Sequence, residues 1–302
     1  MQILVTGGTG LIGRALCRAL SADGHQITVL SRKPETVAAK CGEHVQAIAT
    51  LDEWHAERRF DAVINLAGEP IADKAWSEAR KRVLRDSRVA LTERLVARIA
   101  DARHKPAVLL SGSAVGYYGA CGDTEVDETA PAGADFPAQL CLAWEQAAER
   151  ASASGVRVCL LRTALVLSRD GGLLARMLPP FRFGLGARLG DGRQWMSWVH
   201  INDYVAMVLA LLRSSDVQGA YNMAAPYPVT NADFTATLAR VLGRPAVAAA
   251  PPGMLRLALG ERAGMLLEGQ RLVSLKIEKL GYRFQYSVLE NALRDLLERR
   301  PL

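Results

Sequence analysis

The chain has 302 residues, half of them apolar, which is enough for a large core and more than a usual single domain needs. Its formal net charge is +6, but the basic residues are scattered among 31 acidic ones, and no run of Lys and Arg alternates with aromatic residues. This pattern argues against nucleic acid as a partner and favours an attraction for anionic small molecules.

The chain begins with MQILVTGGTGLIG, which predicts a short strand that turns directly into a helix over residues 11–22. In such a turn Gly7 permits the sharp change of direction, Gly10 lets backbone amides approach a pyrophosphate, and Gly13 lets the helix pack closely against the sheet. The pyrophosphate would lie at the positive end of the helix. The expected dinucleotide contacts in this segment are Gly7, Thr9, Gly10, Leu11, Ile12 and Gly13.

The second predicted strand ends at Leu30 and is followed by Ser31-Arg32-Lys33. An NAD site would have a carboxylate at this position for the ribose hydroxyls, whereas the 2'-phosphate of NADP(H) requires cationic donors. Because a guanidinium can bind a phosphate through two hydrogen bonds, Ser31 and Arg32 predict NADP(H). The alternative is a pair of solvated loop charges that contact no ligand.

Further strand patterns recur along the chain, each short, apolar and separated by segments with helical spacing. The strands span residues 3–6, 27–30, 45–49, 62–66, 108–111 and 158–161, and helices are expected over residues 11–22, 75–100 and 140–152. The apolar face of the second helix would consist of Val83, Leu84, Leu91, Leu95 and Ile99. This alternation predicts an α/β fold with a doubly wound parallel sheet of the Rossmann type.

Between residues 170 and 192 the composition shifts to Gly, Arg and Phe, which marks a departure from the nucleotide-binding domain. We expect a second, smaller C-terminal α/β lobe that holds the substrate. The predicted division is an NADP-binding Rossmann domain over residues 1–168, completed by residues 196–225, and a substrate lobe over residues 169–195 and 226–302.

Two helices are expected beyond residue 195. One covers residues 203–211 and belongs to the first domain. The other follows a capping residue, Thr230 or Asn231, and ends at Gly243.

The five cysteines show neither paired spacing nor a Cys-x-x-Cys motif, so we expect neither a disulfide framework nor a metal site. No segment is long and apolar enough to predict a membrane span. The first strand carries the cofactor motif and is therefore not expected to be a cleaved signal peptide. These features fit a protein of the reducing cytoplasm.

Several motifs of the chain resemble those of extended short-chain dehydrogenase/reductases. They are Gly7-x-x-Gly10-x-x-Gly13, Arg32, Asn65-Leu66-Ala67-Gly68, Ser111-Gly112-Ser113 and Trp198-Val199-His200-Ile201-x-Asp203. More narrowly, the segments GLGARLGDGRQWMSWVHINDY and Leu266-Leu267-Glu268-Gly269-Gln270 are similar to those of atypical epimerase-family proteins named as nucleoside-diphosphate-sugar epimerases.

This resemblance implies that Leu66 and Ala67, with the following Gly68, line the adenine-ribose side of the cofactor. It also implies that Arg88 reaches the cofactor phosphates and that Val166 lies near the nicotinamide. Each has an alternative, because Arg88 could be a solvated helix residue and Leu66 and Val166 would be buried with or without a cofactor. The resemblance further suggests a monomer or a homodimer.

Ordinary members of the superfamily use a Tyr-x-x-x-Lys pair, in which the ammonium group lowers the pKa of the phenol so that it can transfer a proton. This chain lacks the pair, because Phe136 and Leu140 occupy the four-residue spacing and no lysine lies between Pro106 and Leu275. An unassisted phenol with a pKa of about 10 is poorly suited to proton transfer at pH 7.

The residues that remain near the expected site are Ser113, which could orient a substrate oxygen, and Tyr117 and Tyr118, either of which could donate a proton. The two tyrosines are also consistent with a packed loop wall. His200 could titrate usefully, although a structural, hydrogen-bonded histidine is favoured. Glu145 follows the helical pattern and is expected to be solvated.

The lobe segment is rich in arginine and contains Arg169, Arg176, Arg182, Arg188 and Arg193. Arginine suits phosphate or carboxylate recognition through paired hydrogen bonds, although these side chains could equally point into solvent. The expected substrate contacts are Arg182, Arg188, Arg193 and His200.

The hypothesis that follows is an NADP(H)-dependent oxidoreductase or epimerase-like enzyme that acts on an anionic small molecule, either phosphorylated or nucleotide-linked. Loss of the Tyr/Lys pair counts against epimerisation more than against reduction, because an epimerase needs proton transfer in both half-reactions. The alternative is an NADP(H)-binding regulatory protein without turnover, like relatives described as cell-division inhibitors.

Overall fold

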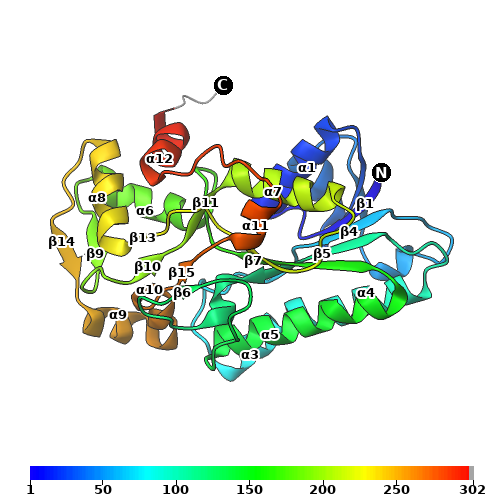
Figure 1. The fold of residues 1–302 in the computed structure, drawn as a ribbon, viewed down its shortest axis with the longest axis horizontal. Helices are drawn as coiled ribbons and strands as arrows, with labels where there is room; N and C mark the ends of the chain where they lie inside the picture. Colours follow the sequence, from blue (N-terminus) through cyan, green and yellow to red (C-terminus); the bar gives the residue numbers. More distant parts are fainter. Residues whose placement is uncertain (299–302) are drawn as a thin grey trace.

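A seven-stranded parallel sheet forms the centre of the computed structural model, which describes residues 1–298 (Figure 1). Its strands are β1 (Gln2–Thr6), β2 (Gln26–Leu30), β3 (Gln46–Ile48), β4 (Ala62–Asn65), β5 (Val108–Ala114), β7 (Arg157–Thr163) and β12 (Gly219–Met223). Their order is β12-β7-β5-β4-β1-β2-β3, so the winding direction changes between β1 and β4. The predicted doubly wound fold is confirmed, and ligands of such sheets bind outside the carboxyl ends of the strands at this change of direction.

Alternating side chains along the strands build a separate core on each face of the sheet. The helices of one face are α1 (Leu11–Ala22), α2 (Val37–Cys41), α7 (Ile201–Arg213) and α11 (Leu275–Lys279), and those of the other are α3 (Glu78–Arg85), α4 (Leu91–Asp101) and α5 (Phe136–Glu149) (Figure 1). Ile3 and Val5 belong to the core under α1 and α7, whereas Leu4 belongs to the core with α4.

The long helix predicted over residues 75–100 is divided in two. It begins later, at α3, where the Ser77 hydroxyl accepts a hydrogen bond from the Arg80 amide, and a π-helical turn, η3 (Asp86–Ala90), joins α3 to α4. The prediction that Val83 faces the core is wrong, because Val83 is 44% exposed while Leu84 is fully buried. A π turn changes the helical phase, so residues before and after it do not share one regular face.

Helix α5 begins four residues before its predicted start. The Asp135 carboxylate accepts a hydrogen bond from the Ala138 amide and caps the helix. Pro137 fits the first turn, where its missing N–H costs nothing. The segment Phe136–Leu140, which replaces the usual Tyr-x-x-x-Lys pair, is therefore helical from its first residue.

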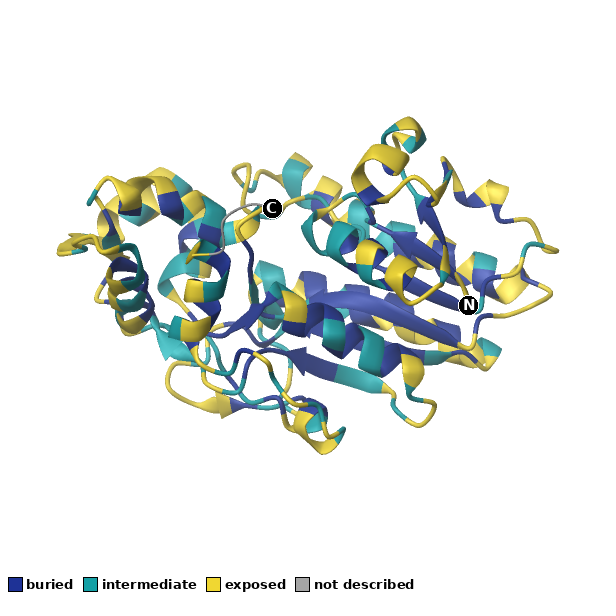
Figure 2. Ribbon diagram, turned by 90° about the horizontal axis from the view of Figure 1, so that it is seen from above, coloured by how far each residue is buried: buried dark blue, intermediate teal, exposed yellow. Residues whose placement is uncertain are grey.

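A third core lies among α6 (Gly172–Arg182), α8 (Asn231–Leu242) and α12 (Leu289–Glu298), with buried residues from β8 (Leu165–Leu167), β10 (Trp195–Met196) and β11 (Trp198–His200). Further elements outside the main sheet are α9 (Pro252–Leu259), α10 (Gly264–Leu267), β6 (Glu125–Val126), β9 (Ala187–Leu189), β13 (Val229–Thr230), β14 (Ala248–Ala250) and β15 (Arg271–Leu272). The short strands pair as β6 with β15, β8 with β11, β9 with β14 and β10 with β13. Trp198, Phe234 and Leu293 are fully buried in this core. Figure 2 shows the buried strands of the main sheet beside the lobe helices, whose outer faces are exposed.

The predicted cap of α8 is confirmed at Thr230, whose hydroxyl accepts a hydrogen bond from the Asp233 amide. The helix ends as predicted at Gly243, which adopts a left-handed conformation with φ of 62°. No helix within residues 1–298 has the length and apolar character needed to cross a membrane. The last four residues of the predicted lobe, 299–302, lie outside the described part of the chain.

Candidate functional site

Each glycine of the first turn is needed for a different structural reason. A Cβ atom on Gly13 would lie 2.3 Å from the Gly7 carbonyl oxygen, so Gly13 allows α1 to pack on the turn itself. Gly7 has a φ of 70°, and its Cβ would lie 2.6 Å from the Leu66 backbone. By contrast, a Cβ on Gly10 would have one described neighbour within 4 Å, the Gly7 carbonyl oxygen at 3.2 Å. Gly10 therefore leaves open the side of the turn from which a phosphate would approach.

Helix α1 begins directly after Gly10 and has no side-chain cap among the described residues. Its first-turn amides, which include those of Leu11 and Ile12, therefore point into the region that Gly10 leaves open. Thr9 lies in the same turn and is partly exposed. This geometry fits the pyrophosphate of a dinucleotide.

A chain of polar contacts fixes the loop after β4 against this turn. The Thr6 hydroxyl donates to Asn65 Oδ1 at 2.6 Å and accepts from the Ala67 amide at 3.1 Å. Asn65 Nδ2 in turn donates to the Ser111 hydroxyl at 3.2 Å. Leu66 and Ala67 are thereby held beside Gly7, where the resemblance predicts the adenine-ribose side of the cofactor. Thr6 is not among the predicted site residues, although a polar residue that ends a buried strand is a usable signal.

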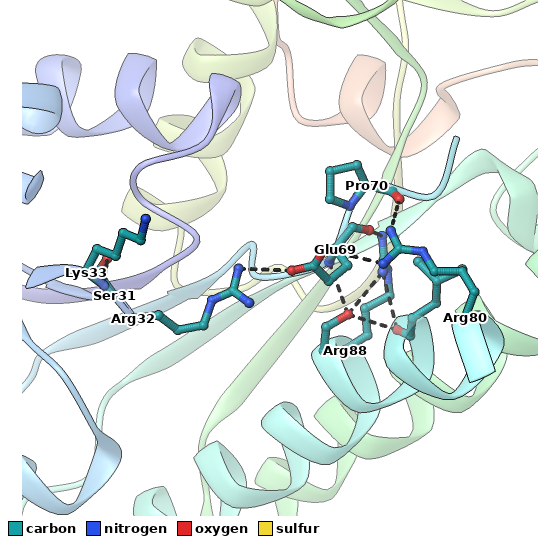
Figure 3. A network of polar contacts seen from close by, with 9 residues as sticks. Ser31, Arg32, Lys33, Glu69, Pro70, Arg80 and Arg88 are labelled. Atoms are coloured by element: carbon teal, nitrogen blue, oxygen red, sulfur yellow. Dashed lines mark hydrogen bonds and ion pairs between the residues drawn. The ribbon is translucent and has the colours of Figure 1, made fainter. Parts of the chain in front are cut away.

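The turn after β2 faces the loop after β4 (Figure 3). Arg32 has a 90% exposed side chain, and its Nη2 lies 3.0 Å from Glu69 Oε1. Arg32 and Arg80 hold the pKa of Glu69 below its ordinary value, with the hydrogen bond from Arg32 as the main cause. Ser31 accepts a hydrogen bond from the Lys33 amide at 3.1 Å and shapes the turn. The guanidinium of Arg32 therefore already points toward an anion across the end of the sheet.

Arg88 comes from η3 and supports the same loop (Figure 3). Its Nη2 donates to the Glu69 carbonyl oxygen at 2.9 Å, and its guanidinium packs on Gly68, whose Cβ would lie 2.9 Å from Arg88 Cζ. Burial lowers the pKa of Arg88. The structure thus places Arg88 behind the loop that holds the predicted adenine-ribose contacts.

Val166 lies on β8 beside Val199 of β11. The chain then turns through Gly171 and Gly172, whose Cβ positions would lie 3.3 and 3.4 Å from the Leu11 side chain. The structure therefore brings the predicted nicotinamide side next to the start of α1, where the predicted pyrophosphate contacts lie.

Ser113 is part of a buried polar network. It lies at the end of β5, opposite Arg162 of β7 in the strand register. Its hydroxyl donates to Glu145 Oε1 at 2.6 Å, and Arg162 binds both oxygens of this carboxylate through Nε and Nη2, each at 2.9 Å. The prediction that Glu145 is solvated is wrong, because its side chain is only 5% exposed and the Arg162 cation compensates its charge.

The two tyrosines of the η4 turn (Val115–Tyr118) both contact Arg162. The Tyr118 hydroxyl donates to Asn222 Oδ1 at 2.6 Å and accepts from Arg162 Nη1 at 3.0 Å. Burial raises the pKa of Tyr118 to about 12, so its proton is held within the core. Tyr117 is partly exposed, and its ring centroid lies 3.5 Å from Arg162 Cζ. Of the two, Tyr117 is better placed to meet a ligand.

Phe136, at the position of the missing tyrosine, packs against Trp76 with their ring centroids 5.2 Å apart. Lys81 of α3 approaches the same ring, with Nζ 5.3 Å from the centroid. This ammonium group also lies 2.9 Å from Glu261 Oε2, in the turn after α9. A lysine from elsewhere in the sequence therefore reaches this region, but a carboxylate holds it.

The predicted substrate residues lie in two different environments, three exposed arginines and one buried histidine. Arg182, Arg188 and Arg193 are exposed and come from three different segments, the end of α6, β9 and the turn before β10. His200 is 1% exposed, and its Nδ1 accepts from the Asn202 amide at 3.1 Å. Its ring stacks on Tyr286 with centroids 3.9 Å apart. These contacts match the structural histidine that the sequence analysis favoured.

The carboxyl ends of β1, β2, β4 and β5 thus carry an open glycine turn, a cationic turn and a buried serine. The model of the NAD-dependent epimerase/dehydratase family matches residues 3–224 of the chain, and that of a domain of unknown function, DUF1731, matches residues 250–296. The chain belongs to the NAD-dependent epimerase/dehydratase family. This result confirms the family resemblance seen in the motifs.

Relatives within this family cover almost the whole chain. Epimerase family protein Mb2239 of Mycobacterium bovis is 42% identical over 292 residues, which are 96% of each chain. The chloroplastic SDR39U1 homolog of Arabidopsis thaliana is 38% identical and covers 99% of this chain and 87% of its own. The crystal structure of human epimerase family protein SDR39U1 with NADPH is 35% identical, with a TM-score of 0.91 and coverage of 99% of this chain and 100% of its own.

Proposed function

We propose that this chain is an NADP(H)-dependent oxidoreductase that acts on a phosphorylated or nucleotide-linked small molecule. The observation that carries the cofactor choice is Arg32, whose guanidinium lies at the end of β2 and already pairs with an anion. The similar human SDR39U1 was crystallised with NADPH, which supports the same cofactor here. The Gly10 turn would hold the pyrophosphate, and Ser31 and Arg32 would hold the 2'-phosphate.

When bound, the nicotinamide supplies or accepts a hydride. In this proposal Val166 lines the nicotinamide side, Ser113 orients a substrate oxygen, and Tyr117 is the candidate proton donor. We favour reduction or oxidation over epimerisation, because Phe136 and Leu140 replace the pair that moves protons in related enzymes.

The exposed Arg182, Arg188 and Arg193 are the candidate contacts for an anionic substrate, by the chemistry of their guanidinium groups. The proposed substrate class therefore rests on the charge and the donor geometry of these guanidinium groups. The cysteines are all free thiols, which suits a cytoplasmic location, and we expect a monomer or a homodimer.

A second function is favoured by one observation, the apolar contact of Phe136 with Trp76 where a catalytic tyrosine would otherwise lie. It is an NADP(H)-binding regulatory protein without turnover, of the cell-division-inhibitor kind. The test is to purify the protein, measure binding of NADPH and NADP⁺ by fluorescence, and then add panels of carbonyl compounds, alcohols and nucleotide sugars. Cofactor turnover tied to product formation supports an enzyme, whereas tight binding with no turnover supports the regulator.

A further inference from the structure

The ion pair of Glu145 with Arg162 is almost completely buried, although it lies at the functional edge of the sheet. Both side chains are 5% exposed. A buried ion pair is weak support for stability, because an apolar pair of similar volume often stabilises a core as well or better. The pair therefore requires another explanation.

The geometry of the carboxylate supplies one. Arg162 binds both oxygens of Glu145, so the carboxylate cannot rotate, and Oε1 also accepts the Ser113 hydroxyl at 2.6 Å. Hydrogen bonds to an ionised group are short and strong. The direction of the Ser113 O–H bond is thus set by a carboxylate that is itself fixed.

Arg162 is held in turn on its other sides. Its Nη1 donates to the Tyr118 hydroxyl at 3.0 Å and to the Glu128 carbonyl oxygen at 3.1 Å, and its plane lies over the Tyr117 ring. Because these partners come from η4 and the following loop, the guanidinium connects that loop to the end of β5. It cannot move without breaking several buried hydrogen bonds.

We infer that Glu145, fixed by Arg162, is a positioning residue that holds the Ser113 O–H and so turns the lone pairs of the Ser113 oxygen toward the substrate, an inference that rests on the proposed function. The Ser113 hydroxyl proton is donated to Glu145. The Ser113 oxygen therefore offers a substrate its lone pairs and accepts a hydrogen bond. Ser113 thus accepts a hydrogen bond from a substrate hydroxyl, and we expect the alcohol member of the redox pair to bind more tightly than the carbonyl member. The Cys141 thiol, one helical turn before Glu145, also lies within hydrogen-bonding reach of the Ser113 side chain.

The first experiment does not depend on turnover. Crystal structures with NADPH are compared for the wild type and for the double variant Glu145→Leu/Arg162→Met, which replaces the pair with apolar side chains that the core accommodates. We expect one Ser113 rotamer in the wild type and a changed or mixed rotamer in the variant. A Ser113 side chain that keeps its wild-type rotamer in the variant overturns the inference.

The second experiment measures steady-state kinetics on the substrate found in the panels. Glu145→Gln should lower kcat by roughly 10- to 100-fold with little change in the KM for the cofactor, because a small misplacement of an orienting group costs that much. Ser113→Ala combined with Glu145→Gln should be no slower than Ser113→Ala alone, since both changes remove the same interaction. Glu149→Gln, an exposed carboxylate one turn further along α5, is the matched control and should keep full activity.

The outcomes separate the inference from the function on which it rests. Full kcat in Glu145→Gln, or a loss that adds to that of Ser113→Ala, overturns the positioning role while leaving an oxidoreductase. Absence of turnover in the wild type overturns the proposed function, and the Ser113 rotamers then still decide whether Glu145 orients that hydroxyl. Tighter binding of the carbonyl member than of the alcohol member to the cofactor-bound wild type overturns the assignment of Ser113 as a hydrogen-bond acceptor.

Discussion

Arg32 and Glu69 form an ion pair of 3.0 Å that joins the turn after β2 to the loop after β4. The Arg32 side chain is 90% exposed, and pairs this exposed contribute at most about 1 kcal/mol. A 2'-phosphate carries more charge than a carboxylate and offers oxygens for two parallel hydrogen bonds to a guanidinium. It can therefore take the place of Glu69, which retains Arg80 as a partner at 3.5 Å.

Substitution of Arg32 should reverse the cofactor preference. Arg32→Glu is expected to lower NADPH affinity by at least about tenfold, because a hydrogen bond to a charged group contributes roughly 1.5–3 kcal/mol. Calorimetric titration of both proteins with NADPH and NADH measures this. Lys40→Glu makes the same charge change at an exposed position of α2 and should leave both affinities unchanged. Equal affinity of the wild type for the two cofactors would refute the assignment.

The glycines at positions 10 and 13 should respond in opposite ways. Gly10→Val should abolish NADPH binding and leave a folded protein, because its side chain enters the open side of the turn and the φ of −75° suits any residue. Gly13→Ala should instead destabilise the fold, since its Cβ would lie 2.3 Å from the Gly7 carbonyl oxygen. Circular dichroism with thermal melting separates the two effects. A folded Gly10→Val protein that still binds NADPH would show that the phosphates bind elsewhere.

The sheet and the phosphate turn could be predicted because their signals are local. Each strand is a short apolar run, and the turn is specified by glycines within seven residues. The buried pair could not be predicted in this way. Glu145 and Arg162 lie 17 residues apart in sequence, and a carboxylate on a helix with no visible partner looks solvated. The signal that could have found them is Arg162 itself, a charged residue that directly follows the apolar run 158–161 of β7.

The π turn between α3 and α4 was also beyond the sequence pattern. A single extra residue in a helical turn shifts the phase of all later residues, yet the apolar spacing on either side still looks regular. Val83 was therefore assigned to the wrong face, and Leu84 holds the buried position. Arg88, which supports the loop after β4, comes from this turn.

Breaking the buried ion pair on one side should be costly, whereas replacing both partners should not be. Arg162→Met leaves the Glu145 carboxylate buried without its cation, and we expect it to lower the free energy of unfolding by about 3–5 kcal/mol. The double variant Arg162→Met/Glu145→Leu should recover most of this loss. Urea denaturation of the three proteins provides the values. A double variant no more stable than Arg162→Met would mean that the remaining contacts of Arg162, to Tyr118 and Glu128, dominate its contribution.

Asp203 of the Trp198–Asp203 motif should attach the C-terminal segment to the main sheet. Its buried carboxylate accepts hydrogen bonds from the Tyr282 hydroxyl at 2.6 Å and from the Tyr286 amide at 2.9 Å. Asp203→Asn replaces the charged acceptor of these hydrogen bonds with a neutral amide. We expect it to lower the free energy of unfolding by roughly 2 kcal/mol. Limited proteolysis should then cleave near residues 282–286 sooner than in the wild type. Asp216→Asn, at an exposed position, is the control, and equal cleavage rates in all three proteins would remove this role from Asp203.

The proton donor should be Tyr117 and not Tyr118. The Tyr118 hydroxyl is committed to Asn222 and Arg162 in the core, whereas Tyr117 is partly exposed and packs on the same guanidinium through its ring. On a verified substrate, Tyr117→Phe should therefore lower kcat by roughly 10²-fold or more, as expected for loss of a general acid. Tyr118→Phe should reduce stability with a much smaller effect on kcat. Ser113→Ala should lower kcat by loss of orientation, and His200→Asn should leave the chemical step unchanged. If Tyr117→Phe and Ser113→Ala both keep full activity, the reaction takes place at a different part of the sheet edge.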